Sequence, residues 1–377
     1  MRQRLLLLFI ILSIPFYNVK PEETFYSEAK KIAQSEKKTL QTVLLLPFSA
    51  GNRMTEYLEG FLLALEDIKK KGISVNLQIF DIGENTEKLT DIFAELYWTD
   101  LDIVVGGLSD AQINLISEFC KKRNTIYVIP FTSKTDELAN NPLAYQINTP
   151  QSTLFKKVST SFSKQYANEN ILFFTPNNQG NKMDFVKVLQ NELQAKGIAF
   201  RVIDKANPTG SDLSAYLRSD KNNVFVFSDD SSDALKKLTT PLKNIQQANV
   251  TQSITLFGHP TWQIYFNDSS DDFFRFNASF YSVFYVDPLA NDVKIFRNRY
   301  NQWYSKELLN TYPKYGILGY DTGMYFLLSL AKQKWAFKGL QTDFYFENLD
   351  KQGGYVNTNV YFVEFNSDYT IKATQKK

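Results

Sequence analysis

Residues 43–107 have the sequence VLLLPFSAGNRMTEYLEGFLLALEDIKKKGISVNLQIFDIGENTEKLTDIFAELYWTDLDIVVGG, and this stretch decides the fold. A short apolar run, a polar loop and an amphipathic helix follow one another here. The same order recurs from Val43 to Pro150 and again from Ile171 to Pro260. Such alternation is typical of parallel sheets that helices cover on both faces. The sequence therefore predicts an α/β fold of two doubly wound parallel-sheet lobes.

The helix predicted at Thr55–Lys70 illustrates the pattern of the first lobe. Its apolar residues recur every three or four positions, as on the buried face of an amphipathic helix, and Gly72 follows its end. The other elements expected in this lobe are the strands Val43–Pro47, Val75–Phe80, Asp102–Val105 and Ile126–Ile129, and the helices Thr86–Tyr97 and Asp110–Lys122.

The second lobe repeats this order, and the chain then returns to the first. The strands expected in the second lobe are Ile171–Phe174, Phe200–Ile203, Asn223–Phe227 and Ile254–Phe257, with helices at Lys182–Lys196 and Ser232–Ile245. A strand at Ser279–Val286 leads back to first-lobe helices at Asp292–Tyr304 and Gly319–Lys334, and 343–371 ends the chain in the second lobe. We expect lobe 1 to be 42–150 plus 287–335 and lobe 2 to be 151–286 plus 336–377, with crossings near 149–151, 284–288 and 334–340.

The N-terminal segment predicts export. In residues 1–20, Arg2 and Arg4 precede an apolar run that matches a secretory signal and is too short to span a bilayer comfortably. Because no clean cleavage site follows, an uncleaved anchor remains an alternative, and we expect membrane contact only through this segment if it is retained. Residues 21–41 predict a charged linker helix, either a solvated lead-in or a partner-docking helix.

The amino-acid composition argues against several classes of function. The chain of 377 residues has a net charge of +2 and no long Lys/Arg block, which argues against a nucleic-acid partner. Cys120 is the only cysteine, so no intrachain disulfide can form. The single histidine, His259, rules out a histidine cluster, and the chain contains no phosphate-binding or dinucleotide-binding glycine motif. We expect neither an enzyme nor a cofactor.

Two loops of the first lobe are candidates for ligand binding. In open α/β sheets, ligands bind beyond the carboxyl ends of strands, near helix N-termini and short hydroxyl side chains. The loop after the third strand contains Gly106, Gly107 and Ser109, and the loop after the fourth contains Thr132 and Ser133. These hydroxyls could hold a carboxylate or another small polar group, or they could simply cap helices.

The second lobe offers candidates in the corresponding loops. Asn178 and Gln179 follow its first strand, and Asp229 and Asp230 follow its third. Either aspartate could receive an ammonium group, although this pair also suits a helix N-terminus. Trp262 could stack on a ring or a sugar face, or it could belong to the core.

Several motifs together resemble the type I periplasmic binding proteins of the branched-chain amino-acid receptor kind. They are Val43–Phe48, Tyr57–Gly60, Asp102–Gly107, Ile129-Pro130, Gly319–Asp321 and Gly353–Asn357, so the resemblance covers roughly residues 42–372. It implies two lobes that close on a solute, a three-stranded hinge, and delivery to a membrane transporter or receptor. The family's hydroxyl cluster, which holds an amino acid's carboxylate, is matched only loosely by Ser109, Thr132 and Ser133.

A narrower resemblance points to a branch in which this domain often follows LysM repeats. It rests on the Leu-Leu-Leu-Pro-Phe start, on His259–Trp262 and on Phe284–Asp287. Besides this loose match of hydroxyl residues, the sequence departs from the receptor family at Gly106-Gly107, which replaces the usual Gly-Pro, and at Asn177–Gly180, which lacks the expected Tyr.

Two functions therefore remain open. The first is an extracytoplasmic solute-binding protein that closes on a small polar ligand, amino acid-like or peptidoglycan-derived, for an ABC-type uptake or sensing system. The second is a ligand-free envelope scaffold or regulator of peptidoglycan metabolism, as in the resembling domains of lipoprotein activators of peptidoglycan synthases. A membrane transporter is the expected partner in the first case and an envelope protein in the second.

Overall fold

The computed structural model describes residues 39–133, 137–248, 252–331, 337–348 and 353–376. The chain forms two compact units, and each is described by itself. Unit 1 comprises Met1–Pro150 and Val286–Asn359, and unit 2 comprises Gln151–Tyr285 and Val360–Lys377. The predicted signal and most of the predicted linker helix lie outside the described residues.

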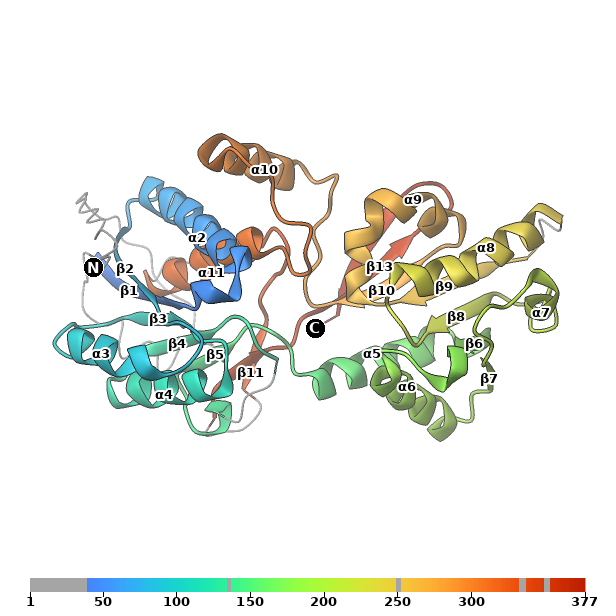
Figure 1. Cartoon of the computed structure of the whole chain (residues 1–377), viewed down its shortest axis with the longest axis horizontal. Coiled ribbons are helices and arrows are strands. Elements are labelled where there is room, and N and C mark those ends of the chain that lie inside the picture. Colours follow the sequence, from blue (N-terminus) through green and yellow to red (C-terminus); the bar gives the residue numbers. More distant parts are fainter. Residues whose placement is uncertain (1–38, 134–136, 249–251, 332–336, 349–352, 377) are drawn as a thin grey trace, which may run out of the picture. The chain divides into compact units, whose positions relative to one another are not determined.

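Unit 1 is built on a seven-stranded sheet in the order β11-β12-β5-β4-β3-β1-β2 (Figure 1). All neighbouring strands are parallel except the pair β11 and β12 at one edge. The strands are β1 (Thr39–Leu46), β2 (Ser74–Asp81), β3 (Ile103–Gly106), β4 (Ile126–Ile129), β5 (Ala144–Gln146), β11 (Phe346–Asn348) and β12 (Tyr355–Asn357).

Helices lie on both faces of this sheet. Figure 1 shows α2 (Asn52–Lys70) and α11 (Tyr315–Leu330) on one face and α3 (Glu87–Leu96) and α4 (Asp110–Lys122) on the other. Helices α2 and α11 approach so closely that a Cβ built on Gly60 would lie 1.7 Å from the carbonyl oxygen of Gly316. Only glycine fits at this crossing. The remaining helices of unit 1 are η1 (Phe48–Ala50), η2 (Glu137–Ala139) and α10 (Asn291–Tyr304).

Unit 2 has a second seven-stranded sheet, in the order β14-β13-β10-β9-β8-β6-β7. Its strands are parallel except that β13 runs antiparallel to both of its neighbours. They are β6 (Asn170–Phe174), β7 (Phe200–Ile203), β8 (Asn223–Phe227), β9 (Ile254–Gly258), β10 (Ser279–Ser282), β13 (Val360–Phe365) and β14 (Ile371–Lys376).

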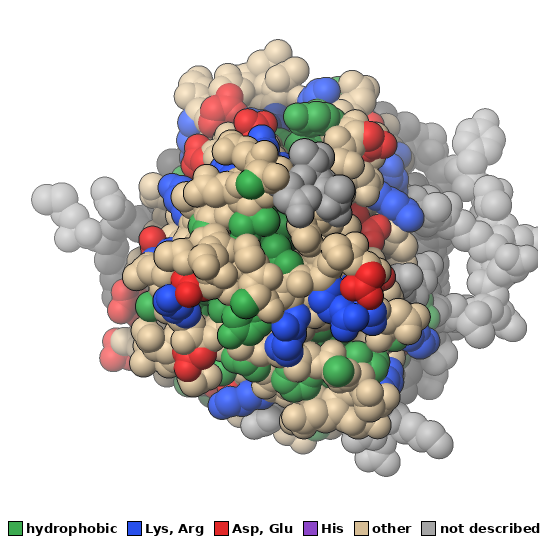
Figure 2. Space-filling view, turned by 90° about the vertical axis from the view of Figure 1, so that its right-hand side faces the viewer, with side chains coloured by type: hydrophobic (Ala, Val, Ile, Leu, Met, Phe, Trp, Pro, Cys, Tyr) green, Lys and Arg blue, Asp and Glu red, His purple; other side chains and the backbone are tan. Residues whose placement is uncertain are grey.

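The helices of unit 2 cover its sheet in the same way. Figure 1 shows α5 (Gln151–Gln165) and α6 (Met183–Ala195) on one face and α8 (Ser232–Ala248) and α9 (Phe266–Arg275) on the other. The shorter helices are η3 (Pro176–Asn178), α7 (Gly210–Ser214) and η4 (Pro260–Tyr265). In Figure 2, acidic and basic side chains interleave on the face in view, with hydrophobic side chains between them.

The α/β class and the two-lobe design predicted from the sequence are confirmed, with mixed rather than purely parallel sheets. The third crossing differs from the expectation. The sequence pattern predicts it near 334–340, but β11 and β12 extend the first sheet, and the boundary between the units falls after Asn359. Edge strands of three residues carry too little periodicity to be recognised in advance.

Smaller differences concern where elements begin and end. Strand β1 starts at Thr39, inside the expected linker, and α11 starts at Tyr315 rather than Gly319. The strand expected at Ser279–Val286 ends at Ser282. Cys120 lies in the core of unit 1, where burial raises the pKa of its thiol. Within the described ranges, no helix combines the length and apolar character needed to cross a membrane.

Candidate functional site

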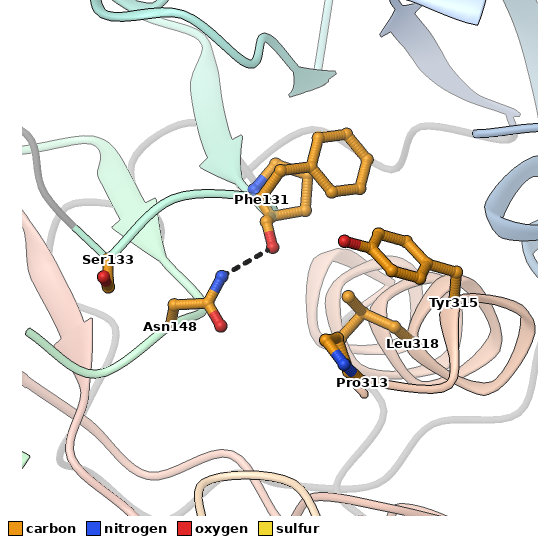
Figure 3. A pocket seen from close by; sticks show the side chains of 7 residues that line it. Phe131, Ser133, Asn148, Pro313, Tyr315 and Leu318 are labelled. Atoms are coloured by element: carbon orange, nitrogen blue, oxygen red, sulfur yellow. Dashed lines mark hydrogen bonds between the residues drawn. The ribbon is translucent and has the colours of Figure 1, made fainter. Parts of the chain in front are cut away.

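A pocket of about 160 Å³ opens in unit 1 beyond the carboxyl ends of β4 and β5 (Figure 3). Three segments of the chain form it: the loop after β4, the loop after β5, and the start of α11. Its lining residues are Pro130, Phe131, Ser133, Asn148, Pro313, Tyr315 and Leu318. This position is where parallel α/β sheets usually bind ligands.

The polar groups of the pocket come from three side chains. Asn148 donates a hydrogen bond from Nδ2 to the carbonyl oxygen of Pro130 at 3.0 Å, which fixes the orientation of its amide. Ser133 contributes a hydroxyl group from the loop after β4, and Tyr315 contributes its phenol from the first turn of α11. The pocket thus combines an amide oxygen and two hydroxyl groups with apolar side chains.

Aromatic contacts hold the apolar wall in place. The ring of Phe131 meets Tyr57 of α2 edge-on, with ring centroids 4.9 Å apart, and it lies 6.2 Å from the ring of Tyr315. The guanidinium carbon of Arg53 lies 5.8 Å from the centroid of the Tyr315 ring, within the range of a cation–π contact. Tyr57 is fully buried, so this cluster joins the pocket to the core of unit 1.

Ser109 caps a helix. Its hydroxyl oxygen accepts a hydrogen bond from the backbone N–H of Gln112 at 3.3 Å, and the two residues form a capping box at the start of α4. The Gln112 side chain also accepts from the N–H groups of Leu108 and Ser109. Its amide nitrogen donates to the carbonyl oxygens of Gly83 and Asn85. A buried glutamine therefore occupies the backbone N–H groups of Leu108 and Ser109.

Thr132 and Ser133 lie in the loop after β4, as expected, and both are partly buried. Only Ser133 lines the pocket. The structure does not bring Ser109 into this pocket, so the three hydroxyl residues do not form one cluster there.

Asn178 and Gln179 are held by contacts within unit 2. Asn178 has a left-handed backbone with φ of 51°, and its amide donates to the Asp204 carboxylate at 2.8 Å. The carbonyl oxygen of Gln179 accepts from the Ser228 hydroxyl at 2.6 Å. This bond joins the loop after β6 to the loop after β8, so the structure does bring the two predicted loops together.

Asp230 already has an ammonium partner. Lys182 Nζ lies 3.0 Å from its carboxylate, and Asn181 and Thr261 donate to the same group. Burial opposes ionisation here, but the Thr261, Lys182 and Asn181 donors outweigh it and lower the pKa of Asp230. Asp229 accepts from the backbone N–H of Ser231 at 2.8 Å, one residue before α8. Asp229 therefore forms its hydrogen bond next to the start of α8, as the helix-terminus interpretation predicts. Asp230 instead forms an ion pair within unit 2.

Trp262 belongs to the core, which corrects its assignment as a ligand-stacking residue. Its exposed fraction is 0%, and its ring stacks on Phe273 at 5.5 Å and meets Phe227 edge-on at 5.0 Å. His259 is also buried: Nε2 lies 2.8 Å from the carbonyl oxygen of Phe227, and Nδ1 lies 3.2 Å from the Tyr281 hydroxyl. Because a carbonyl can only accept, Nε2 carries the proton and Nδ1 accepts from Tyr281.

Sequence reasoning missed Asn148, Tyr315 and Arg53. Asn148 follows a strand of only three residues, which shows no usable pattern. Tyr315 lies in the return segment, four residues before the helix start that the sequence suggested. The one feature of the sequence that could have identified Tyr315 was its position beside Gly316 at the start of the helix. No group of acidic, histidine or cysteine residues suited to a metal ion occurs among the residues that the structure describes.

The comparisons with known proteins agree with this architecture. A family model described as periplasmic binding protein matches residues 46–341. A structure described as a branched-chain amino acid ABC transporter from Rhodospirillum rubrum is 11% identical, covers 89% of this chain and 100% of its own, and has a TM-score of 0.64. An ABC transporter substrate-binding protein from Desulfitobacterium hafniense in complex with Leu is 12% identical, with coverages of 89% and 100% and a TM-score of 0.51.

A third similar structure is full-length LpoA from Haemophilus influenzae. It is 15% identical with a TM-score of 0.54, and the match covers 92% of this chain but 61% of LpoA. At these identities, the three structures establish a shared fold alone. No curated protein sequence matches the chain. Because the family model spans most of the sequence and the two-unit fold agrees with it, the chain belongs to the periplasmic binding protein family.

Proposed function

We propose that this chain is an extracytoplasmic solute-binding protein that binds a small polar solute for an ABC-type uptake or sensing system. The observation that carries the proposal is the pocket of unit 1, which combines Ser133, Asn148 and Tyr315 with an aromatic wall at the carboxyl edge of the sheet. A few placed polar groups in a concave apolar site are the usual features of a small-molecule site. Family membership supports the same class of function.

Export is part of this proposal. The apolar run that follows Arg2 and Arg4 supports a secretory signal, and residues 1–38 lie outside the described part of the chain. The expected partners are the solute itself and a membrane transporter or receptor that receives it.

A second candidate function, a ligand-free envelope scaffold, has one observation in its favour. In each unit, candidate polar groups are already bonded: the N–H groups of Leu108 and Ser109 by Gln112 in unit 1, and the Asp230 carboxylate by Lys182 in unit 2. A fold that has lost its solute could keep its loops ordered in this way. These internal bonds argue against a zwitterionic ligand at those groups. They do not involve the pocket beside Tyr315, which can still bind a solute.

A thermal-shift screen of the purified protein distinguishes the two functions. The compounds are amino acids, short peptides, sugars, peptidoglycan fragments and small organic acids. A ligand at about one hundred times its dissociation constant should add about 2.7 kcal/mol to the free energy of unfolding, because it binds only the folded state. One clear stabiliser supports solute binding, whereas a uniformly flat screen supports the scaffold.

Substitutions then locate the site. Ser133→Ala and Asn148→Ala should each weaken binding of the stabilising compound, because each removes a polar group from the pocket wall. Ser367→Ala is the matched control, since this serine is exposed in unit 2. Unchanged affinity in both pocket variants would show that the ligand binds outside this pocket.

A further inference from the structure

The amino edge of the unit 1 sheet, where its parallel strands begin, brings together the carboxyl ends of three helices. Strands β1 to β4 are parallel, and α2, α3 and α4 each connect one of them to the next in the chain (Figure 1). A helix that joins two parallel strands runs back along the sheet, so its last turn lies where the following strand begins. The ends of α2, α3 and α4 therefore share the amino edge, at the opposite end of the strands from the pocket.

Two aromatic side chains are exposed at this edge. Tyr97 and Trp98 follow α3 directly, and their exposed fractions are 56% and 89%. Their rings meet edge-on, with centroids 4.8 Å apart. Trp98 is the most exposed of the large hydrophobic side chains that the structure describes. Exposed aromatic surface of this kind marks a place where a protein contacts another protein or a membrane.

The turn that carries Trp98 is held in place by Arg123. This residue, the C-cap of α4, donates from Nη1 to the carbonyl oxygen of Tyr97 and from Nη2 to that of Thr99, both at 2.6 Å. Its guanidinium carbon also lies 5.7 Å from the centroid of the Tyr97 ring, within the range of a cation–π contact. Because the backbone is bonded on both sides of Trp98, the exposure of this side chain is a fixed feature of the fold.

Lysines at the ends of α2 and α4 share the edge with the aromatic pair. The exposed ones are Lys69, Lys70, Lys71, Lys121 and Lys122. Two of them, Lys70 and Lys122, have acidic partners one turn earlier in their own helices. The other three form no ion pair with any residue in the described ranges, and Asp100 is the exposed acidic residue of the Trp98 turn. The edge therefore combines exposed aromatic rings with an excess of positive charge.

The N-terminal segment enters unit 1 at the same edge. Thr39, the first residue of β1, pairs with Ser74, which follows the end of α2. The N–H of Gln41 donates to the carboxylate of Asp102, in the segment that follows α3. The turns after α2 and α3 therefore flank the entry of the chain. Residues 1–38 contain the apolar run predicted as a signal or an uncleaved anchor, and a retained anchor would place a membrane on the side of this edge.

We propose that the amino edge of unit 1 lies on an anionic phospholipid surface. Tyr97 and Trp98 then lie at the level of the headgroups, where such amphipathic rings are favoured. Lys69, Lys71 and Lys121 lie near lipid phosphates, whose negative charge attracts them. Because the pocket is at the other end of the strands, it stays accessible to a solute while the protein is on the membrane. This contact would be a second one besides the N-terminal segment.

The test uses the full chain with lipid vesicles and measures tryptophan fluorescence. Bromine atoms on the acyl chains quench an indole ring only at short range, so quenching reports that a tryptophan contacts lipid. Residues 1–38 contain no tryptophan, so insertion of the N-terminal segment gives no signal of its own. Vesicles of brominated phosphatidylcholine mixed with phosphatidylglycerol should quench the wild type, and vesicles without phosphatidylglycerol should quench it much less.

Two tryptophan variants assign the quenching to one ring. Trp98→Phe should lose most of the quenching, because it removes the fluorophore at the lipid. Trp303→Phe is the matched control: this tryptophan is also exposed in unit 1, at 59%, but it lies on α10, and its loss should leave the quenching unchanged. Both side chains are exposed, so both variants should melt at the temperature of the wild type.

Lysine variants test the charge. At one lipid concentration, Lys71→Gln and Lys121→Gln should each lower the ratio of quenched to unquenched Trp98 about fivefold, the effect of about one lysine near an anionic surface. Lys236→Gln removes the same charge from an exposed position on α8 of unit 2 and should leave the ratio unchanged.

The outcomes are decisive for the membrane contact. An unquenched wild type, or equal quenching in Trp98→Phe, would overturn the inference, and so would equal quenching with and without phosphatidylglycerol. A dimer that Trp98→Ala abolishes, without quenching by lipid, would assign the edge to a second copy of the chain instead. None of these measurements involves a solute, so the thermal-shift screen tests the proposed function separately.

Discussion

Protonation of His259 should destabilise unit 2 at mildly acidic pH. The imidazole is fully buried, with Nε2 donating to the carbonyl oxygen of Phe227 and Nδ1 accepting from Tyr281. A second proton on Nδ1 would break the bond from Tyr281 and place a charge in the core. Burial therefore lowers the pKa of His259 from 6.5 to about 4.

The magnitude and the sign follow from linkage. The unfolded chain takes up a proton near pH 6.5 and the folded chain only near pH 4, so stability is lost as the pH falls through this window. With these values, the free energy of unfolding of unit 2 should be about 2 kcal/mol lower at about pH 5 than at about pH 8. Below pH 4, it should be about 3 kcal/mol lower than at about pH 8. His259→Gln keeps a donor for the carbonyl oxygen of Phe227 and should remove this part of the pH dependence.

The assay benefits from the presence of a single histidine in the chain. A proton NMR titration of its imidazole C–H signals reports the folded-state pKa directly. Urea unfolding of the wild type and His259→Gln at several pH values, followed by a probe in unit 2, reports the free energy. A folded-state pKa near 6.5, or equal pH dependence in both proteins, would refute this reasoning.

Three further substitutions test other parts of the structure. Burial raises the pKa of Asp321 to about 7 against three backbone N–H donors, so unit 1 should lose stability as the pH rises from about 4 to about 7. Asp321→Asn should flatten this trend in urea unfolding followed in unit 1, and an unchanged slope would contradict the assignment. Gln112→Ala removes four hydrogen bonds to the backbone and should cost about 2–4 kcal/mol, measured in the same way. A loss below about 1 kcal/mol would mean that water replaces these bonds. Trp262→Ala should destabilise unit 2 by about 3–5 kcal/mol, because it leaves a cavity in the core. A normal melting temperature combined with lost ligand binding would instead restore Trp262 as a binding residue.

Much of the fold could be predicted because strand and helix periodicities are local properties of the chain. The ranges predicted for α4, β4, β7 and β8 agree with the structure at both ends. Each of these strands is bounded by polar or glycine-containing segments, and α4 begins at a recognisable N-cap, Ser109. By contrast, β5, β11 and β12 have three residues each, and their pairing depends on partners distant in the sequence.

The candidate site was only partly predictable, because a residue type does not reveal what its side chain contacts. Asp230 and Trp262 are residue types that often bind ligands, yet one is paired with Lys182 and the other is packed in the core. Ser133 was predicted from its position after a buried strand, and it lines the pocket. The contact between Tyr315 and Arg53 could not be predicted from the sequence, because α2 and α11 are separated by more than two hundred residues.

The sequence alone determined the α/β class, the two-lobe order and one of the loops that line the pocket, since these depend on hydrophobic periodicity and on short-range signals. Tertiary structure alone decided in which loops the polar groups are hydrogen-bonded within the protein and in which loops they face a pocket. It bonded Gln112 of α4 to one loop, paired Lys182 with Asp230 in another, and placed Ser133 and Asn148 on the pocket wall. Hydrogen bonding and burial are properties of contacts, and here the contacts are made by residues that the chain brings together from distant positions.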